Sequence, residues 1–385
     1  MRRLCLATVG ATAVAVLVGQ QPAPTPRLFD PRRPPEQELD TTIADGFTLA
    51  AVGDLIISRP LSQLLPRDPA FSAAVRILRD ADAAFGNFEN VALDPGSFAG
   101  YPYPGRDDVS LVAEPAVARD LAAMGFDLVS RANNHAMDLG IAGMRETTRV
   151  LDQAGLVHAG VGENRAEARA ARYLETPQGR VALVSMASTF SEGGDAMPPR
   201  GRAPGRPGLS AVRVIRSFVL PPDAMAQLRS VKAALDAPGK TCEITSTFER
   251  ESCEKAEREA PKELTFLDTQ FRAGERAARH YEISPVDLDE IRRAIRQGKQ
   301  QSDLVIATIH SHETGLSCEQ PGDFLPVLAR EAIEAGAGLF VATGEHRLMP
   351  IEIYKGRPTS CKKHSYAPAQ TSDATIADRD GTNEK

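Results

Sequence analysis

The feature that most constrains this chain is an alternation of short apolar runs with helix-like stretches, in which several apolar runs end abruptly in polar residues. Residues 47–52 lead into Gly53-Asp54, and residues 304–309 lead into His310. Strands that alternate with helices predict a layered α/β domain. Because sites in open α/β sheets form at the carboxyl ends of the strands, we expect these polar residues to converge on one site.

The expected elements cover much of the chain between residues 47 and 342. Strands are expected at residues 47–52, 126–130, 181–186, 304–309 and 338–342. Helices are expected at residues 70–84, 113–124, 144–154, 285–297 and 325–335. Ser284 can cap the fourth of these helices, and Pro285 suits its first turn. No internal repeat is evident, and 385 residues suffice for one large domain or two ordinary ones.

The N-terminus has the layout of a secretory signal peptide, which we assign to residues 1–23. Arg2 and Arg3 form a basic start, and an apolar run at residues 4–19 precedes small residues. We therefore expect a secreted or periplasmic protein, with an uncleaved membrane anchor as the alternative. The apolar run is shorter than the ~20 residues that a spanning helix needs, which disfavours the anchor. Residues 24–46 are rich in proline and indicate a flexible linker.

Polar stretches interrupt the α/β pattern between residues 191 and 284, and we assign this region to an insertion. Residues 191–222 contain many Gly, Pro and Arg residues and are expected to form a surface loop. Between residues 243 and 263, 11 of 21 residues are charged, which predicts a solvated helical insertion or a lid that binds substrate or a partner. Cys242 and Cys253 could close a short disulfide loop in an oxidising compartment, and their spacing does not match a zinc site.

Polar residues that follow the expected strands and helices make up the candidate site. They are Asp54, Asn87, Glu89, Asn134, His135, His310, His312 and His346. Mixed imidazole, carboxylate and amide ligands suit Zn²⁺, Mn²⁺ or Fe better than the all-oxygen shells of Ca²⁺ or Mg²⁺. Each residue also has an ordinary interpretation, such as a helix cap for Asp54, turn residues for the asparagines and a surface position for His346. Four of the seven histidines follow strand-like runs, and that coincidence favours the site.

Composition and motifs argue against several classes of protein. A net charge of −6 gives no reason to expect a nucleic-acid partner. Ser130 and Ser185 lack the flanking glycines of a nucleophile elbow, which argues against a serine hydrolase. No Walker loop or Gly-x-Gly-x-x-Gly motif follows a strand, so a nucleotide-phosphate site is unsupported.

Five stretches together carry a family resemblance. They are Val52-Gly53-Asp54, Gly86-Asn87-Phe88-Glu89, Ala132-Asn133-Asn134-His135-Ala136-Met137-Asp138-Leu139-Gly140, His310-Ser311-His312-Glu313, and Glu345-His346 continuing through Pro350 to Pro358. Over about residues 47–358 the chain resembles the CapA family of capsule or poly-γ-glutamate biosynthesis proteins. That family is similar to calcineurin-like metallophosphoesterases. The resemblance implies a four-layer α/β/β/α sandwich of the metallo-dependent phosphatase type around a centre of two divalent ions, Mn, Fe or Zn.

The resemblance also implies a role for each candidate residue. The metal ligands would be Asp54, Asn87, Glu89, Asn134, His310 and His346. His135 would be the catalytic residue, as an acid or as a group that contacts phosphate. His312 and Glu313 are further candidates in the same stretch as His310.

The chain departs from the resembled family at three places. Ile56 stands where a calcineurin-like histidine would be, which is usual for CapA-like proteins. Thr343 stands where a histidine ligand is expected, and threonine is a poor ligand for a divalent metal. Residues 359–385 are polar where a terminal strand is expected, so we interpret them as a frameshifted or otherwise replaced C-terminus and expect disorder. Loss of that strand would expose a sheet edge.

These observations lead to three hypotheses of function. The first is an extracytoplasmic CapA-like protein of capsule or poly-γ-glutamate synthesis or export, which performs metal-dependent hydrolysis or transfer. Its substrate would be an anionic polymer or a phosphorylated or γ-glutamyl compound, and its partner the membrane-bound capsule synthesis machinery. The second is a catalytically degenerate scaffold that binds polymer or assembly partners. The third is a secreted phosphodiesterase.

Overall fold

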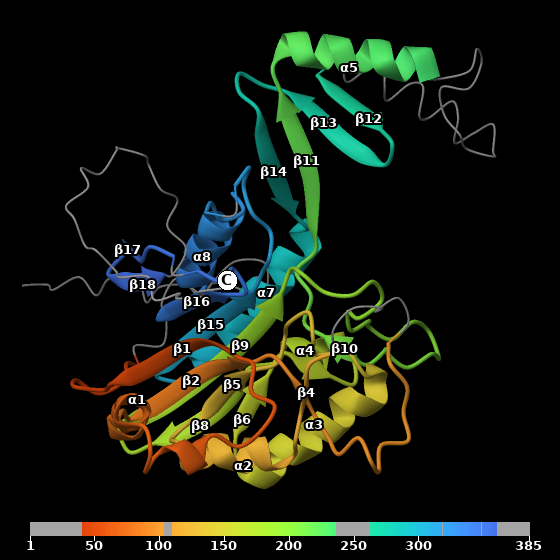
Figure 1. The fold of residues 1–385 in the computed structure, drawn as a ribbon. Coiled ribbons are helices and arrows are strands. Elements are labelled where there is room, and N and C mark those ends of the chain that lie inside the picture. The colour runs from red at the N-terminus through yellow and green to blue at the C-terminus, as the bar shows by residue number, and fades with distance from the viewer. Residues whose placement is uncertain (1–40, 104–109, 236–261, 318, 348, 360–385) are drawn as a thin grey trace, which may run out of the picture. The chain divides into compact units, whose positions relative to one another are not determined.

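The structure, a computed structural model, describes residues 41–103, 110–235, 262–317, 319–347 and 349–359. These residues belong to the second of the two compact units of the chain, Gln37–Lys385. The expected signal peptide, most of the expected linker, all five cysteines and the tail after residue 359 lie outside the described residues. The described fold is mixed α/β with parallel and antiparallel sheets, which confirms the predicted class (Figure 1).

The first sheet is fully parallel, and helices cover one of its faces. Its strands, in spatial order, are β1 (Leu49–Leu55), β2 (Ala83–Phe88), β5 (Leu128–Ser130) and β6 (Val157–Ala159). The helices are α1 (Pro69–Asp80), α2 (Ala116–Ala123) and α3 (Gly140–Ala154). Val75, Leu121 and Leu151 of these helices form an apolar core with Ala84 and Val129 of the sheet.

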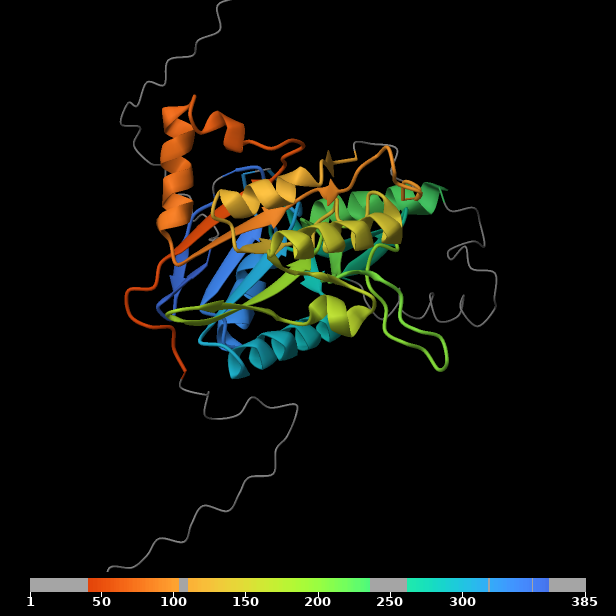
Figure 2. The same cartoon turned by 90° about the horizontal axis from the view of Figure 1, so that it is seen from below.

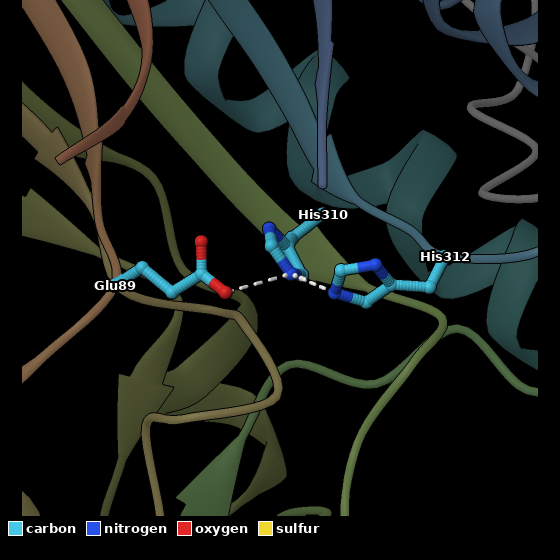
Figure 3. Close-up of side chains that lie close together, drawn as sticks. All are labelled: Glu89, His310 and His312. Carbon is cyan, nitrogen blue, oxygen red and sulfur yellow. Dashed lines mark hydrogen bonds and ion pairs between the residues drawn. The ribbon is translucent and has the colours of Figure 1, made fainter. Parts of the chain in front are cut away.

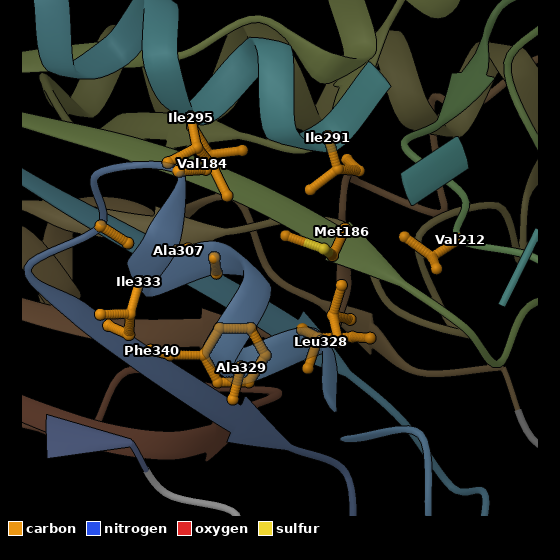
Figure 4. Close-up of a cluster of buried hydrophobic side chains, with 14 of the residues drawn as sticks. Val184, Met186, Val212, Ile291, Ile295, Ala307, Leu328, Ala329, Ile333 and Phe340 are labelled. Carbon is orange, nitrogen blue, oxygen red and sulfur yellow. The ribbon is translucent and has the colours of Figure 1, made fainter. Parts of the chain in front are cut away.

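The second sheet has six strands and its own helices. In spatial order the strands are β17 (Glu352–Tyr354), β18 (Arg357–Thr359), β16 (Leu339–Thr343), β15 (Leu304–His310), β9 (Gly179–Ala187) and β8 (Arg172–Thr176). The four central strands are parallel, and the two edge strands are antiparallel to their neighbours. Helices α7 (Pro285–Gln300) and α8 (Leu325–Glu334) pack on one face, where Ile291 and Leu328 share a core with Met186 and Phe340 (Figure 4).

The two sheets share a third core through their other faces. Phe85, Leu128, Leu183 and Ile306 belong to this core, whereas the residues next to them in each strand belong to the helix-covered cores. Figure 2 shows α2 and α3 (yellow) on one side of the strands and α7 (teal) on the other. A site at the end of this shared core therefore takes side chains from both sheets.

Smaller elements complete the described fold. They are η1 (Ser62–Leu64), the pair β3 (Val91–Ala92) and β4 (Val112–Ala113), the pair β7 (Val161–Gly162) and β10 (Gly208–Leu209), and α4 (Arg165–Arg169). A four-stranded sheet contains, in spatial order, β12 (Glu263–Phe266), β13 (Thr269–Ala273), β11 (Val214–Leu220) and β14 (Ala278–Ile283), with α5 (Pro222–Leu235) packed on β13. Among the described residues, no helix combines the length and apolar character that crossing a membrane requires.

Two sequence-based assignments are wrong. The helix expected at residues 70–84 ends at Asp80, because Ala81 is extended and the next alanines, Ala83 and Ala84, face two different cores as the start of β2. The loop expected at residues 191–222 contains β10 and β11, so part of the proposed insertion is folded sheet. The charged stretch from residue 243 to 261 lies outside the described residues. The start of α7 is confirmed, since Ser284 caps it by accepting from Asp287 N.

Candidate metal centre

The core between the two sheets becomes polar at the carboxyl ends of the strands. Along β15 the fully buried residues on this face change from Ile306 through Thr308 to His310, and along β2 from Phe85 to Asn87. On the neighbouring strands Ser130, Ser185 and Thr343 lie at or near the carboxyl end of this face. The hydroxyls of Ser130 and Ser185 lie 2.7 Å apart and join the two sheets. The shared core thus ends in a buried polar layer.

Asp54 reaches this layer through an irregularity in β1. Ala51 and Asp54 pair with Phe85 and Asn87, so between these pairs β1 contains one residue more than β2. An extra residue of this kind re-aims the side chains that follow it. In a regular strand Asp54 would face the helix-covered core with Val52, whereas here it hydrogen bonds to Asn87 between the sheets.

Three side chains from distant parts of the chain lie close enough to hold one metal ion. They are Glu89 just after β2, His310 at the end of β15 and His312 in the following loop, and Figure 3 shows them converging. One donor atom of each lies within 4.8 Å of the other two. His310 Nε2 is 3.0 Å from His312 Nε2 and 3.5 Å from Glu89 Oε1. Two ligands about 2.1 Å from an ion at a tetrahedral angle lie ~3.4 Å apart, so the spacing suits one such ion.

His312 has the protonation state that a ligand needs. Burial lowers its pKa to about 4, and the charges of His310 and His346 act in the same direction. Its imidazole is therefore neutral at pH 7, with a lone pair available for metal. His346, an expected ligand, is exposed, and its ring lies edge-on to the ring of His312 with centroids 5.1 Å apart. His346 therefore lies on the exposed side of the cluster.

Asp54 and Asn87 lie near the other nitrogen of His310. Asn87 Nδ2 donates to Asp54 Oδ1 at 2.8 Å and is 3.1 Å from His310 Nδ1, and Asp54 Oδ1 is 3.6 Å from that nitrogen. The N–H of Gly344 donates to Asp54 Oδ2 at 3.1 Å. Burial alone would raise the pKa of Asp54, but His310, Asn87 and Gly344 together lower it to about 2. Asp54 is therefore an anion at neutral pH.

His135 is oriented by a buried carboxylate. His135 Nδ1 lies 2.8 Å from Asp138 Oδ2, which also accepts from Leu111 N at 2.9 Å. His135 Nε2 lies 3.9 Å from Glu89 Oε1. A carboxylate at Nδ1 favours the tautomer with its proton on that nitrogen. His135 thus presents Nε2 to the cluster.

The two asparagines before His135 have different environments. Asn133 is buried, and its amide donates to Asn87 Oδ1 at 3.2 Å and to Phe88 O at 2.9 Å. Its own Oδ1 accepts from His135 N at 3.1 Å. Asn133 therefore orients both Asn87 and His135. Asn134, the expected ligand, is half-buried, and its side-chain oxygen is shielded from solvent.

Glu313, a further ligand candidate, is engaged by hydroxyl groups. Its carboxylate accepts from Ser188 Oγ, from Thr189 Oγ1 at 2.9 Å and from Ser311 Oγ at 2.7 Å. Thr189 Oγ1 also accepts from His312 N at 2.8 Å. Glu313 therefore fastens the loop that carries His312 to the segment after β9.

Sequence reasoning missed Asn133, Asp138 and Glu345 as site residues. The signal for Asp138 was present, since a residue three positions after His135 in the same turn can reach its ring. Both carboxylate oxygens of Glu345 are shielded from solvent, without a hydrogen-bond partner among the described residues. Burial, and then the charge of Glu313, raise the pKa of Glu345 to about 7. Glu345 lines a cavity of about 570 Å³ together with Asp54 and other residues of β1, β16 and β18.

Comparison with known proteins identifies relatives along most of the chain. A family model described as "Bacterial capsule synthesis protein PGA_cap" matches residues 48–360. "Uncharacterized protein y4sH" and "Uncharacterized protein y4uA" of Sinorhizobium fredii (strain NBRC 101917 / NGR234) are each 46% identical over 321 residues, or 83% of this chain. The chain spans 65% of the length of these two relatives.

Two further comparisons are more distant. "Capsule biosynthesis protein CapA" of Bacillus anthracis is 27% identical over 152 residues, which cover 38% of this chain and 36% of that protein. A crystal structure of a hypothetical protein from Thermus thermophilus aligns with a TM-score of 0.36 and 12% identity, covering 82% of this chain and 75% of that chain. A structural likeness this weak carries no argument about the fold.

Proposed function

This chain belongs to the bacterial capsule synthesis protein family, and on that premise we propose that it is a metal-dependent hydrolase or transferase that acts on an anionic polymer. The bond it acts on would be a phosphate ester or a γ-glutamyl amide in capsule or poly-γ-glutamate synthesis or export. The family match supports the biological setting. The residues at the ends of the two sheets support the chemistry.

The observation that carries the proposal is the convergence of Glu89, His310 and His312. A carboxylate and two imidazoles are a common ligand set for Zn²⁺ and also suit Mn²⁺ and Fe. His310 is 0% exposed and Glu89 2% exposed. A bound ion is one way to compensate the burial of such groups, and the convergence of their donor atoms suits an ion.

We extend the proposal to a second ion beside Asp54. Asp54 is an anion there, and Asn87 lies beside it. The proposed ligands of the two ions are Asp54, Asn87, Glu89, Asn134, His310 and His346, as expected from the sequence, with His312 added.

Divalent ions bound here would polarise the scissile group and lower the pKa of the attacking water. The chain itself would supply orientation and proton transfer. His135, held through Nδ1 by Asp138, presents Nε2 to the cluster, where, once Nε2 has also taken up a proton, it would donate that proton to the leaving group. Glu313 would keep His312 in place through the loop hydroxyls.

We also propose that the fold is the four-layer sandwich of metallo-dependent phosphatases. Three separate apolar cores support this arrangement: one between α1–α3 and the first sheet, one between the sheets, and one between the second sheet and α7–α8. For location, we propose secretion or export to the periplasm, supported by the basic and apolar N-terminal residues. Capsule polymer and the membrane-bound synthesis machinery are the proposed partners.

Metal content of the purified chain tests the proposal. The wild-type protein should retain about two ions of Zn, Mn or Fe per chain by elemental analysis. His310→Ala and His312→Ala should each lose at least one of them. His280→Ala is the matched control, because His280 lies outside the cluster and pairs with Asp323.

Activity separates the enzyme from a scaffold. The wild-type protein with added Mn²⁺ should cleave bis-p-nitrophenyl phosphate or shorten poly-γ-glutamate, and His135→Ala should abolish that reaction without loss of metal. Wild-type protein that stays metal-free after incubation with each of these ions, and binds polymer as well as His310→Ala does, would reject the enzyme in favour of the scaffold.

A further inference from the structure

We propose that Thr343 is a positioning residue that fixes the tautomer of His310 and so presents His310 Nε2 as a metal ligand. This inference rests on the proposed function, because it takes Nε2 as the ligand atom. It changes the meaning of Thr343, which the sequence suggests is only a lost histidine ligand. It is supported by the register of two strands, the surroundings of one ring nitrogen and a glycine that packs on the ring.

Strand pairing places Thr343 beside His310. The two residues are Cα partners at the ends of the parallel strands β15 and β16, so their side chains leave the sheet on the same face. His310 is fully buried and Thr343 is 6% exposed. Thr343 Oγ1 lies 3.1 Å from His310 Nδ1, within hydrogen-bond distance.

The surroundings of His310 Nδ1 single out Thr343 as its acceptor. If Nε2 binds metal, Nδ1 keeps its proton and needs an acceptor. Asn87 Nδ2 is also 3.1 Å away, but an amide nitrogen only donates, and this orientation of Asn87 is set by Asn133, which donates to Asn87 Oδ1. Asp54 Oδ1 is farther away, at 3.6 Å, and already accepts from Asn87 Nδ2. Among the described residues, the Thr343 hydroxyl is the acceptor nearest to Nδ1.

Gly344 restricts the ring from another side. A Cβ built at Gly344 would lie 2.9 Å from His310 Cε1 and 3.1 Å from Nε2, so the ring packs closely on this glycine. The ring also lies against His312, with Nε2 to Nε2 at 3.0 Å. Gly344 and His312 limit where the ring can lie and so keep Nδ1 beside the Thr343 hydroxyl, whose hydrogen bond favours the proton on that nitrogen.

One arrangement competes with this assignment. If Asn87 Nδ2 donates to an unprotonated Nδ1, the proton moves to Nε2 and the Thr343 hydroxyl becomes a second donor or is dispensable. The two arrangements differ in which ring nitrogen is protonated in the metal-free protein. Nitrogen NMR reports that directly, and a purely structural role for Thr343 would not change it.

The test compares Thr343→Val, which keeps the shape but removes the hydroxyl, with Thr343→Ser, which keeps the hydroxyl. The full chain is labelled with ¹⁵N-histidine and stripped of metal by a chelator. Its ring nitrogens are then recorded at pH 8, with His310→Gln identifying the His310 signals. We expect Nδ1–H in wild type and Thr343→Ser, and Nε2–H in Thr343→Val. Zinc affinity, measured by competition with a chromophoric chelator, should fall about 10–100-fold in Thr343→Val and little in Thr343→Ser.

The outcomes separate the inference from the proposed function. The role of Thr343 would be overturned if His310 in the wild type carries its proton on Nε2. It would also be overturned if wild type and Thr343→Val have the same tautomer and the same zinc affinity, even if zinc binds tightly. If no variant binds zinc, the metal proposal fails, and the tautomers alone decide whether Thr343 has the proposed role. That role is upheld if His310 carries its proton on Nδ1 in wild type and Thr343→Ser but not in Thr343→Val. Matching circular dichroism spectra of the two variants establish that both are folded.

Discussion

Replacing Asp287 with asparagine is expected to destabilise the fold by about 2–4 kcal/mol. Asp287 is 0% exposed, and its carboxylate accepts from Arg169 Nη2 at 2.6 Å and from Arg213 Nε and Nη2 at 2.7 and 2.8 Å. Arg169 is the last residue of α4, Arg213 precedes β11, and Asp287 lies in the first turn of α7. One side chain therefore joins three elements that are distant in sequence.

The magnitude follows from the ion pairs. Burial alone would raise the pKa of Asp287, but hydrogen bonds from Arg213 and Arg169 lower it from 3.8 to about 2. Since one pKa unit corresponds to about 1.4 kcal/mol, the native state stabilises the carboxylate by about 2 kcal/mol. Removing one partner of a buried ion pair typically costs about 3–5 kcal/mol. Asparagine keeps the shape and part of the hydrogen bonding, so we expect a loss of about 2–4 kcal/mol.

The lowered pKa of Asp287 makes the stability of the fold depend on pH. The folded-state pKa lies below the unfolded-state value, so this stabilisation is complete above about pH 4 and is lost as the pH falls toward 2. Wild-type stability should therefore fall more steeply over that interval than the stability of Asp287→Asn.

Urea unfolding followed by circular dichroism at pH 7 and at pH 3 measures both effects. Asp289→Asn is the matched control, because Asp289 lies on the same helix in an exposed pair with Arg293 and should cost less than about 0.5 kcal/mol. A loss below about 1 kcal/mol in Asp287→Asn, or an equal loss in Asp289→Asn, would refute the reasoning.

Three further predictions concern the site. Asp138→Asn should lower turnover about 10²–10⁴-fold with metal content unchanged, because asparagine no longer fixes the proton of His135 on Nδ1. Unchanged turnover would contradict that role. Gly86→Ala should lower the free energy of unfolding by about 1–3 kcal/mol, since a Cβ there would lie 2.7 Å from a β1 side-chain carbon. Gly53→Ala, which meets nothing within 4 Å, is its control in thermal unfolding. Glu345→Gln should raise stability at pH 8 by about 1–3 kcal/mol but not at pH 4, because a carboxyl with its pKa raised to about 7 destabilises the fold only when ionised; equal pH profiles of the two proteins would count against this.

Local sequence patterns were sufficient for the fold class. Residues 181–186 and 304–309 are mostly apolar because β9 and β15 are covered on both faces, which is typical of parallel strands. The start of α7 was also predicted from the sequence, because a capping serine and a proline act within one turn of the helix. β11 was missed because its pattern mixes apolar residues with Arg and Ser, as in a sheet that is only partly covered.

The sequence predicted the chemical types of the candidate ligands better than it predicted which residues they are. The sequence placed carboxylate, amide and imidazole groups at the ends of strands, and that was enough to expect a metal site. It ranked His346 above His312, yet the structure places His312 in contact with His310 and leaves His346 exposed. It also kept Glu313 as a candidate, whereas hydroxyl groups from two segments engage that carboxylate.

By itself, then, the sequence determined many of the strands and helices and which chemical groups stand at their ends, because both depend on neighbouring residues. Only the tertiary structure decided where those groups point. Asp54 points into the site because β1 has one residue more than β2 between two paired positions. Its partner Asn87 is 33 positions away in the sequence, and Asn87 contacts His310, which is 223 positions further along the chain. Side-chain direction in a sheet depends on register between distant strands, and no local pattern records it.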